Sequence, residues 1–358
     1  MAAAPNSKHV FHLKDSEPFF RSDYGSMQRA FVDSFPILKG RNMSMKRLIL
    51  EGKGIREPHW HANTPELTYC LKGSALVNIT DTHSKFSSFT VSEGQMFYVD
   101  SGSLHHIENV SDTEPAEFII CFRSEKPEDF SLGASFGAMT HAVLGNTWNV
   151  PTEALDHVNL STEDRHIIPR NGPVEYPKFH SEKDPHKFDA EGTAPNLKGE
   201  VVEVHQAKQS FWPALTQLAM YSIRVEDKGM REPHWHPITA EMGYVHEGMA
   251  RMTILDPDGS TDTYTLKPGD TYYIPPAYPH QIEVLPEGGD HIHFCIFFDQ
   301  PMPQDIGFKS TIVGVPHETM ASTLGISRQE VDKLEGTDGT PLVVKRVNSV
   351  DPVKDWTE

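Results

Sequence analysis

The sequence predicts an all-β protein made of two copies of one small β-barrel domain, each followed by short α-helices. A motif occurs twice, as GIREPHWH at 54–61 and as GMREPHWH at 229–236, at an offset of 175 residues. Short alternating or apolar stretches follow each motif, such as 67–80 and 242–255, and Gly or Pro-Gly turns separate them. Such spacing is typical of antiparallel strands that close a sandwich or barrel.

The same offset relates Glu66 to Glu241, Gly94 to Gly269 and His105 to His280, so the two copies share one backbone frame. This frame predicts four segments. Residues 1–36 form an N-terminal arm, 37–165 the first domain, 166–199 a linker and 200–358 the second domain. The linker is recognised by its proline, charge and histidine.

Helical segments are expected after each barrel, at 151–158 and 316–334, each with a proline at its start. Matching Pro151 with Pro316 reduces the offset between the copies. The first copy is therefore expected to carry ten extra residues just after its last barrel strand.

Composition narrows the class of protein. The chain has 358 residues, 37% hydrophobic and 23% charged, and no apolar run approaches the length of a membrane span. The N-terminal residues form no signal-peptide core, so a cytoplasmic protein without a membrane partner is expected. Cys70, Cys121 and Cys295 are interpreted as buried thiols without a disulfide. A formal charge of −18 argues against nucleic acid as a partner, and an anionic substrate would need a local cationic anchor.

Each copy contains a candidate metal site. Residues two apart on a strand face the same side, so His59 and His61 point together, as do His234 and His236. A glutamate opens the next strand and a third histidine follows a later turn. Three imidazoles and one carboxylate suit Mn, Fe, Zn, Cu or Ni. The predicted ligands, for two metal ions per chain, are His59, His61, Glu66, His105, His234, His236, Glu241 and His280.

A second His-x-His pair serves as an internal comparison. At the common offset the counterparts of His291 and His293 are Ala116 and Phe118, so this pair is interpreted as structural or surface. His106, beside His105, has Gln281 as its counterpart and is expected on the opposite face.

At these residues the sequence resembles the cupin family, whose two motifs are His-x-His-x4-Glu-x6-Gly and Gly-x5-Pro-x-Gly-x2-His-x3-Asn. The first copy departs by Asp100 in place of proline, and the second by Ala277 and Val284. Among two-domain cupins, Arg-Glu-x-His-Trp-His in both halves is similar to oxalate decarboxylase. The resemblance therefore implies two tandem cupin (jelly-roll) barrels.

It further implies a manganese enzyme that uses dioxygen as a cofactor and splits oxalate, a small dicarboxylate, into formate and carbon dioxide. Arg56 and Arg231 precede the ligands and can offer a charge-assisted hydrogen bond to a carboxylate. The alternative for each arginine is an ordinary salt bridge.

In the family a mobile Ser-Glu-Asn-Ser lid delivers a proton in the first domain. Here Asp129 falls at the acid position with Glu128 beside it, and a solvated acidic loop is the alternative. The family's second domain has a glutamate where this chain has Cys295. We therefore expect the first site to be catalytic and the second mainly structural.

Three other functions remain open: oxalate oxidation to carbon dioxide and hydrogen peroxide, a dioxygenase acting on another small acid, and a metal-binding storage protein. A homo-oligomer also remains open.

Overall fold

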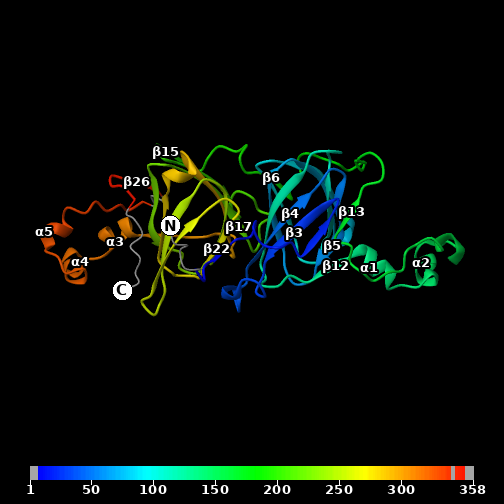
Figure 1. Cartoon of the computed structure of the whole chain (residues 1–358), viewed down its shortest axis with the longest axis horizontal. Helices are drawn as coiled ribbons and strands as arrows, with labels where there is room; N and C mark the ends of the chain where they lie inside the picture. The colour runs from blue at the N-terminus through cyan, green and yellow to red at the C-terminus, as the bar shows by residue number, and fades with distance from the viewer. Residues whose placement is uncertain (1–6, 340–342, 351–358) are drawn as a thin grey trace. The chain divides into compact units, whose positions relative to one another are not determined.

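The computed structural model describes residues 7–339 and 343–350, and the strands within these ranges form four sheets (Figure 1). Two compact units divide the chain. One is Leu13–Gly192, and the other combines the segment up to His12 with the residues from Thr193 onward. The predicted all-β class with two barrels is confirmed. Among the described helices, none is both long and apolar enough to cross a membrane.

The first barrel is a sandwich of two antiparallel sheets. One sheet has the order β14 (Lys187–Asp189), β9 (Gln95–Val99), β6 (Glu66–Lys72), β11 (Ala116–Phe122), β4 (Ser44–Leu50), β3 (Gly25–Ala30) and β2 (Phe20–Ser22). The other has the order β12 (Asp129–Ser131), β5 (Gly54–His61), β10 (Leu104–Asn109), β7 (Ser74–Asp81) and β8 (Lys85–Ser92), with β13 (Ile167–Pro169) also paired to β5. Alternate side chains such as Val77, Phe89 and Phe118 fill the space between the sheets.

The second barrel repeats this order. One sheet has β1 (Val10–Phe11), β22 (Thr271–Ile274), β19 (Glu241–Glu247), β24 (His291–Phe298), β17 (Ala219–Glu226), β16 (Val202–Ala207) and β15 (Leu197–Gly199). The other has β21 (Thr261–Leu266), β20 (Ala250–Leu255), β23 (His280–Val284), β18 (Gly229–Trp235) and β25 (Ile306–Gly307), with β26 (Val343–Lys345) paired to β18. Val245, Tyr264 and Phe294 belong to its core.

The short strand β1 lies in the barrel built from the C-terminal half of the chain. Val10 pairs with Tyr272, and the His9 ring nitrogen Nδ1 lies 2.9 Å from the Tyr273 carbonyl oxygen. In the first barrel the equivalent strand is β14, which comes after the other strands of that barrel in sequence. There, His186 Nδ1 lies 2.9 Å from the Tyr98 carbonyl oxygen. The expected arm thus supplies strands to both units. The expected linker supplies β13 and β14 to the first barrel and β15 to the second.

Short helices follow each barrel, as predicted, but the expected ten-residue excess in the first copy is wrong. The first copy has α1 (Leu132–Gly137), α2 (His141–Trp148) and the 3-10 helix η3 (Thr152–Leu155). The second has α3 (Phe308–Gly314), α4 (His317–Leu324) and α5 (Arg328–Val331). Helices α2 and α4 both end at a left-handed residue, Asn149 and Gly325. Pro151 precedes η3 and so corresponds to Ser327, which precedes α5, rather than to Pro316. The match of the two prolines misled the prediction because proline fits the first turn of any helix.

The two copies instead differ by one residue in the loop before β24. Phe118 pairs with Cys70, and the equivalent pair in the second barrel is Phe294 with Val245. This register makes Glu117 the counterpart of His293, so the assignment of Ala116 and Phe118 as the counterparts of His291 and His293 is wrong. The structural interpretation of His293 agrees with its hydrogen bond to Ser222, 2.8 Å long, between β17 and β24.

The candidate metal centres

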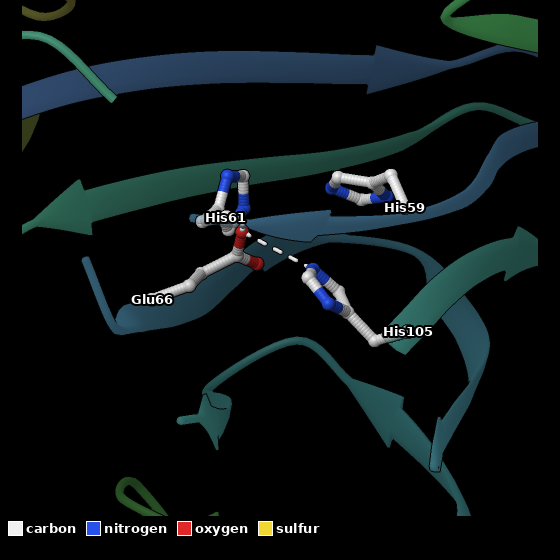
Figure 2. A group of neighbouring side chains, drawn as sticks. All are labelled: His59, His61, Glu66 and His105. Carbon is white, nitrogen blue, oxygen red and sulfur yellow. Dashed lines mark hydrogen bonds and ion pairs between the residues drawn. The ribbon is translucent and has the colours of Figure 1, made fainter. Parts of the chain in front are cut away.

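Each barrel brings its four predicted ligands together. His59 and His61 lie on β5, Glu66 opens β6 and His105 lies on β10 opposite His59, and their rings and carboxylate converge in Figure 2. Their ligand atoms lie within 4.8 Å of one another, and so do those of the equivalent set in the second barrel: His234, His236, Glu241 and His280. All eight side chains are buried.

The imidazoles of the first centre are oriented through their Nδ1 atoms. His59 Nδ1 lies 2.8 Å from the Glu57 carbonyl oxygen, and His105 Nδ1 lies 3.0 Å from that of Ser103. His61 Nδ1 lies 2.6 Å from Asp129 Oδ1. Nδ1–H donation to these acceptors leaves each Nε2 as the lone-pair atom that a metal requires. The Nε2 atoms of His61 and His105 lie 2.8 and 3.5 Å from Glu66 Oε2.

The imidazoles of the second centre are also oriented through their Nδ1 atoms. His234 and His280 place Nδ1 at 2.7 and 3.0 Å from the carbonyl oxygens two residues before them. His236 Nδ1 lies 2.6 Å from Asp305 Oδ1, and its Nε2 lies 2.8 Å from Glu241 Oε2. His236 Nδ1 also lies 3.1 Å from the Gln304 carbonyl oxygen, which takes its hydrogen bond, so Asp305 repeats the position of Asp129 as an ion-pair partner.

These residues fit a divalent metal ion. The Nε2 atoms of His105, His234 and His280 are buried without a hydrogen-bond partner, which is costly for a polar atom unless another ligand satisfies it. Three neutral imidazoles and one carboxylate complete the donor set of a transition metal rather than of Ca²⁺ or Mg²⁺.

Asp129 is held as an anion behind the first centre. Its Oδ2 lies 3.1 Å from Arg56 Nη2 and 3.2 Å from Lys46 Nζ, and its Oδ1 faces His61. Burial favours the neutral acid, but Lys46, His61 and Arg56 outweigh burial and hold the pKa of Asp129 well below its usual range. In the second centre burial acts the same way on Asp305, while Arg231 and His236 lower its pKa to about 2.

Both predicted arginines thus lie at the centres and contact a carboxylate. Arg56 also donates from Nη1 to the His166 carbonyl oxygen at 3.1 Å. Sequence reasoning missed Lys46 and Asp305. At the fixed offset of 175 residues the counterpart of Asp129 is Gln304. Only the one-residue shift before β24 identifies Asp305 as its structural equivalent. Nothing local distinguishes Lys46 as a residue of the site.

The predicted lid loop differs from an acid-bearing lid. Asp129 begins the strand β12, where it pairs with His61 on β5. Glu128 is exposed, and its backbone N–H donates to Asn63 Oδ1 at 3.1 Å. Phe130 stacks on Trp60 with ring centroids 5.6 Å apart. The segment is therefore held by β5 from Asp129 onward, and by the turn after β5 at Glu128.

The two centres differ in how the glutamate ligand is supported. Glu66 Oε1 accepts a 2.8 Å hydrogen bond from Thr68, whereas Glu241 Oε1 accepts one of 2.6 Å from the Tyr272 hydroxyl. The Tyr272 ring occupies space that a side chain at Gly243 would fill. Cys295 lies opposite Tyr244 and Ser222, and alternation on β24 directs it away from the core residues Phe294 and Ile296.

Fold and site together define a metal-binding protein of two β-barrels with one three-histidine, one-glutamate centre in each. Residues 11–155 and 188–332 both match the cupin family, so the chain belongs to the cupins.

Known oxalate decarboxylases resemble the chain over most of its length. That of Bacillus subtilis (strain 168) is 26% identical over 339 residues, which cover 90% of this chain and 83% of the relative. One from Arthroderma benhamiae is 22% identical over 92% of this chain and 83% of the relative. A solved structure of the Bacillus subtilis enzyme, studied for its Mn(II) centres, has a TM-score of 0.83 at 25% identity and covers 96% of this chain and 90% of its own. Germin-like protein 5-1 of Oryza sativa subsp. japonica is 31% identical over 38% of this chain and 63% of the relative.

Proposed function

We propose that this chain is a manganese-dependent enzyme that acts on oxalate or a closely similar small dicarboxylate. The observation that carries the proposal is the pair of buried three-histidine, one-glutamate centres, each with an arginine three residues before its first histidine. The similarity to oxalate decarboxylases over nine-tenths of the chain supports oxalate as the substrate and manganese as the metal. Dioxygen is proposed as the co-catalyst by the same resemblance.

At the first centre, His59, His61, Glu66 and His105 would hold the metal, which supplies a Lewis acid for a chelating dianion and a one-electron redox partner. Arg56 has five N–H donors, and its contacts with Asp129 and His166 leave donors for a substrate carboxylate. Asp129 keeps His61 and Arg56 oriented. The buried walls of the barrel exclude water, which strengthens each of these charge interactions.

Decarboxylation to formate needs a proton on the carbon left after carbon dioxide departs. Asp129 is a poor donor, because both oxygens are engaged and its pKa is held low. Glu128 is exposed at the start of the fastened segment. These positions support a positioning role for Asp129 rather than the role of proton donor. They also favour a second candidate function, the oxidation of oxalate. In that reaction oxalate, dioxygen and two protons give two carbon dioxide and one hydrogen peroxide.

One assay tests both functions. Manganese-loaded protein is given oxalate at mildly acid pH, and carbon dioxide, formate and peroxide are measured together. Formate equal to carbon dioxide identifies the decarboxylase, and peroxide at half the carbon dioxide identifies the oxidase. Failure to consume oxalate, with both metals bound, would contradict the proposal.

The compartment and assembly are also proposals. The three cysteines are buried and form no disulfide, which agrees with a reducing cytoplasm. We propose that the chain assembles into a homo-oligomer, because two-domain cupins commonly do so. Sedimentation of the metal-loaded chain would test this.

A further inference from the structure

We infer that Lys46 makes the first metal centre, rather than the second, the one that binds an anionic ligand strongly. The identity of the anion as oxalate rests on the proposed function. The difference between the two centres rests only on side chains of this chain.

Lys46 points into the first barrel. It lies on β4 opposite Ile120, whose side chain belongs to the core, and only 4% of the Lys46 side chain is exposed. Its ammonium lies 3.2 Å from Asp129 Oδ2 and 5.0 Å from the centroid of the Phe122 ring. Both neighbours also contact His61: Asp129 through Oδ1, and Phe122 with ring centroids 4.8 Å apart. The cation is thus one side chain away from a metal ligand along two paths.

Asp129 is the close carboxylate of two cations at once. Lys46 and Arg56 share the single oxygen Oδ2, so one carboxylate faces two permanent cations. Asp164 lies 4.0 Å from Arg56 Nη1, and a quarter of the Asp164 side chain is exposed. This second carboxylate therefore partly compensates Arg56 and not Lys46. Two buried cations that share one carboxylate oxygen are only partly compensated, and a bound anion would relieve the remaining cost of burying them.

The second centre provides the internal control, because the residue equivalent to Lys46 is Tyr221. Tyr221 pairs with Ile296 as Lys46 pairs with Ile120, and its ring packs 4.9 Å from that of Phe298. Burial raises the pKa of Tyr221, so its phenol is neutral. Within residues 7–339 and 343–350, Arg231, at 3.2 Å, is the one lysine or arginine that forms an ion pair with Asp305.

One further cation approaches Asp305 at longer range. Lys208 is partly buried, and its ammonium lies 5.0 Å above the Phe211 ring rather than on the carboxylate. The Asp305 cluster therefore has one positive charge fewer in contact than the Asp129 cluster. One unit charge acting across a few ångströms of buried protein changes the affinity for a dianion by at least about tenfold.

The inference is tested by titrating the intact, manganese-loaded chain with oxalate in the absence of dioxygen. Calorimetry gives the affinity and the number of sites, and the Mn(II) resonance spectrum shows which centre changes. The unaltered chain should bind one oxalate tightly and a second at least about tenfold more weakly. Lys46→Met should remove the tight class, Lys46→Arg should keep it within about threefold, and Tyr221→Lys should strengthen the weak class.

Formate serves as a second probe, because it is a monoanion and should lose less affinity in Lys46→Met than oxalate does. Metal content and thermal unfolding of each variant establish that the fold is retained, and Tyr221→Lys tests the idea even if Lys46→Met fails to fold. Equal oxalate affinities in the unaltered chain and folded Lys46→Met would overturn the inference, as would no anion binding at all. If oxalate is bound through Lys46 but never consumed, the proposed function fails while this inference stands.

Discussion

At the residue scale, the carboxylates behind His61 and His236 decide how each centre is held. Asp129 Oδ1 and Asp305 Oδ1 both lie 2.6 Å from the Nδ1 of a ligand histidine, and an arginine binds the other oxygen of each. Such outer partners fix the ring and raise its basicity, which makes them nearly as important as the ligands.

Asp129→Asn should weaken metal binding at the first centre by roughly 10–100-fold, because the amide cannot accept from His61 and pair with two cations together. Elemental analysis after dialysis against a weak chelator measures the loss. Glu128→Gln, one residue away and exposed, is the matched control and should keep both metals. Full retention of the metal in Asp129→Asn would show that the carboxylate is not needed for positioning.

Metal binding at the second centre should depend on pH through His236. Burial opposes its protonation, but Asp305 and Glu241 outweigh burial and raise the pKa of His236 to about 9. The metal-free histidine is then protonated at neutral pH, so the metal must displace a proton. We expect manganese affinity to rise about tenfold per pH unit between pH 7 and 9, and to level off above that. Affinity measured across this range by Mn(II) resonance checks the slope; a flat profile would contradict it.

At the scale of elements, the strand pair β19 and β22 carries a feature absent from β6 and β9. Gly243 leaves room for Tyr272, whereas Thr68 and Phe97 occupy these positions in the first barrel. A Cβ at Gly243 would lie 2.2 Å from the Tyr272 ring atom Cζ.

Gly243→Ala should therefore destabilise the second barrel by about 2–4 kcal/mol, because the packed core cannot move the ring aside. Gly314→Ala is the control, since nothing lies within 4 Å of its added Cβ. The double variant Gly243→Thr with Tyr272→Phe copies the arrangement of the first barrel and should recover stability. Urea unfolding of the three proteins decides the matter, and a neutral Gly243→Ala would contradict the packing argument.

Strand β1 gives a second prediction for an element. Removing residues 1–12 deletes the pairing of β1 with β22 and the contact of His12 with Asp270, 2.7 Å long. Because β22 carries Tyr272, which donates to Glu241, the second centre should lose metal and the second barrel should unfold several degrees earlier. The first centre should keep its metal. Calorimetry and metal analysis distinguish this result from a uniform loss.

Elements close to the motifs were predictable from sequence, because periodicity and turns identify β5, β6 and β10 directly. The strand that forms one edge of each barrel, β14 in the first and β1 in the second, could not be predicted from sequence. β1 and β14 contain two and three residues, too few for a periodic pattern, and each pairs with a strand far away in sequence. The eight ligands could be placed because repetition marks them. Lys46 lies within an apolar strand and is connected to the site only by the closure of the barrel.

At the scale of the whole molecule, the repeat predicts two metal ions per chain with different roles. His59→Ala should abolish turnover and leave about one metal per chain. His234→Ala should also leave one metal but reduce activity mainly through stability, because the first centre holds Lys46 and Arg56 together. Metal content, thermal unfolding and oxalate consumption are measured on both variants. Loss of all activity in a folded His234→Ala chain with an occupied first centre would contradict this division.

The placement of β1 has a consequence for how the protein is made. A ribosome releases the chain from its N-terminus, so Val10 emerges long before Tyr272, the residue with which it pairs. The first barrel lies within one continuous stretch, residues 13–192, and needs no earlier segment. It can therefore fold while synthesis continues. The second barrel must pair with a strand that precedes the first barrel in sequence, which closes a long loop at an entropic cost that grows only slowly with length. The order of synthesis thus favours completion of the first barrel before the second.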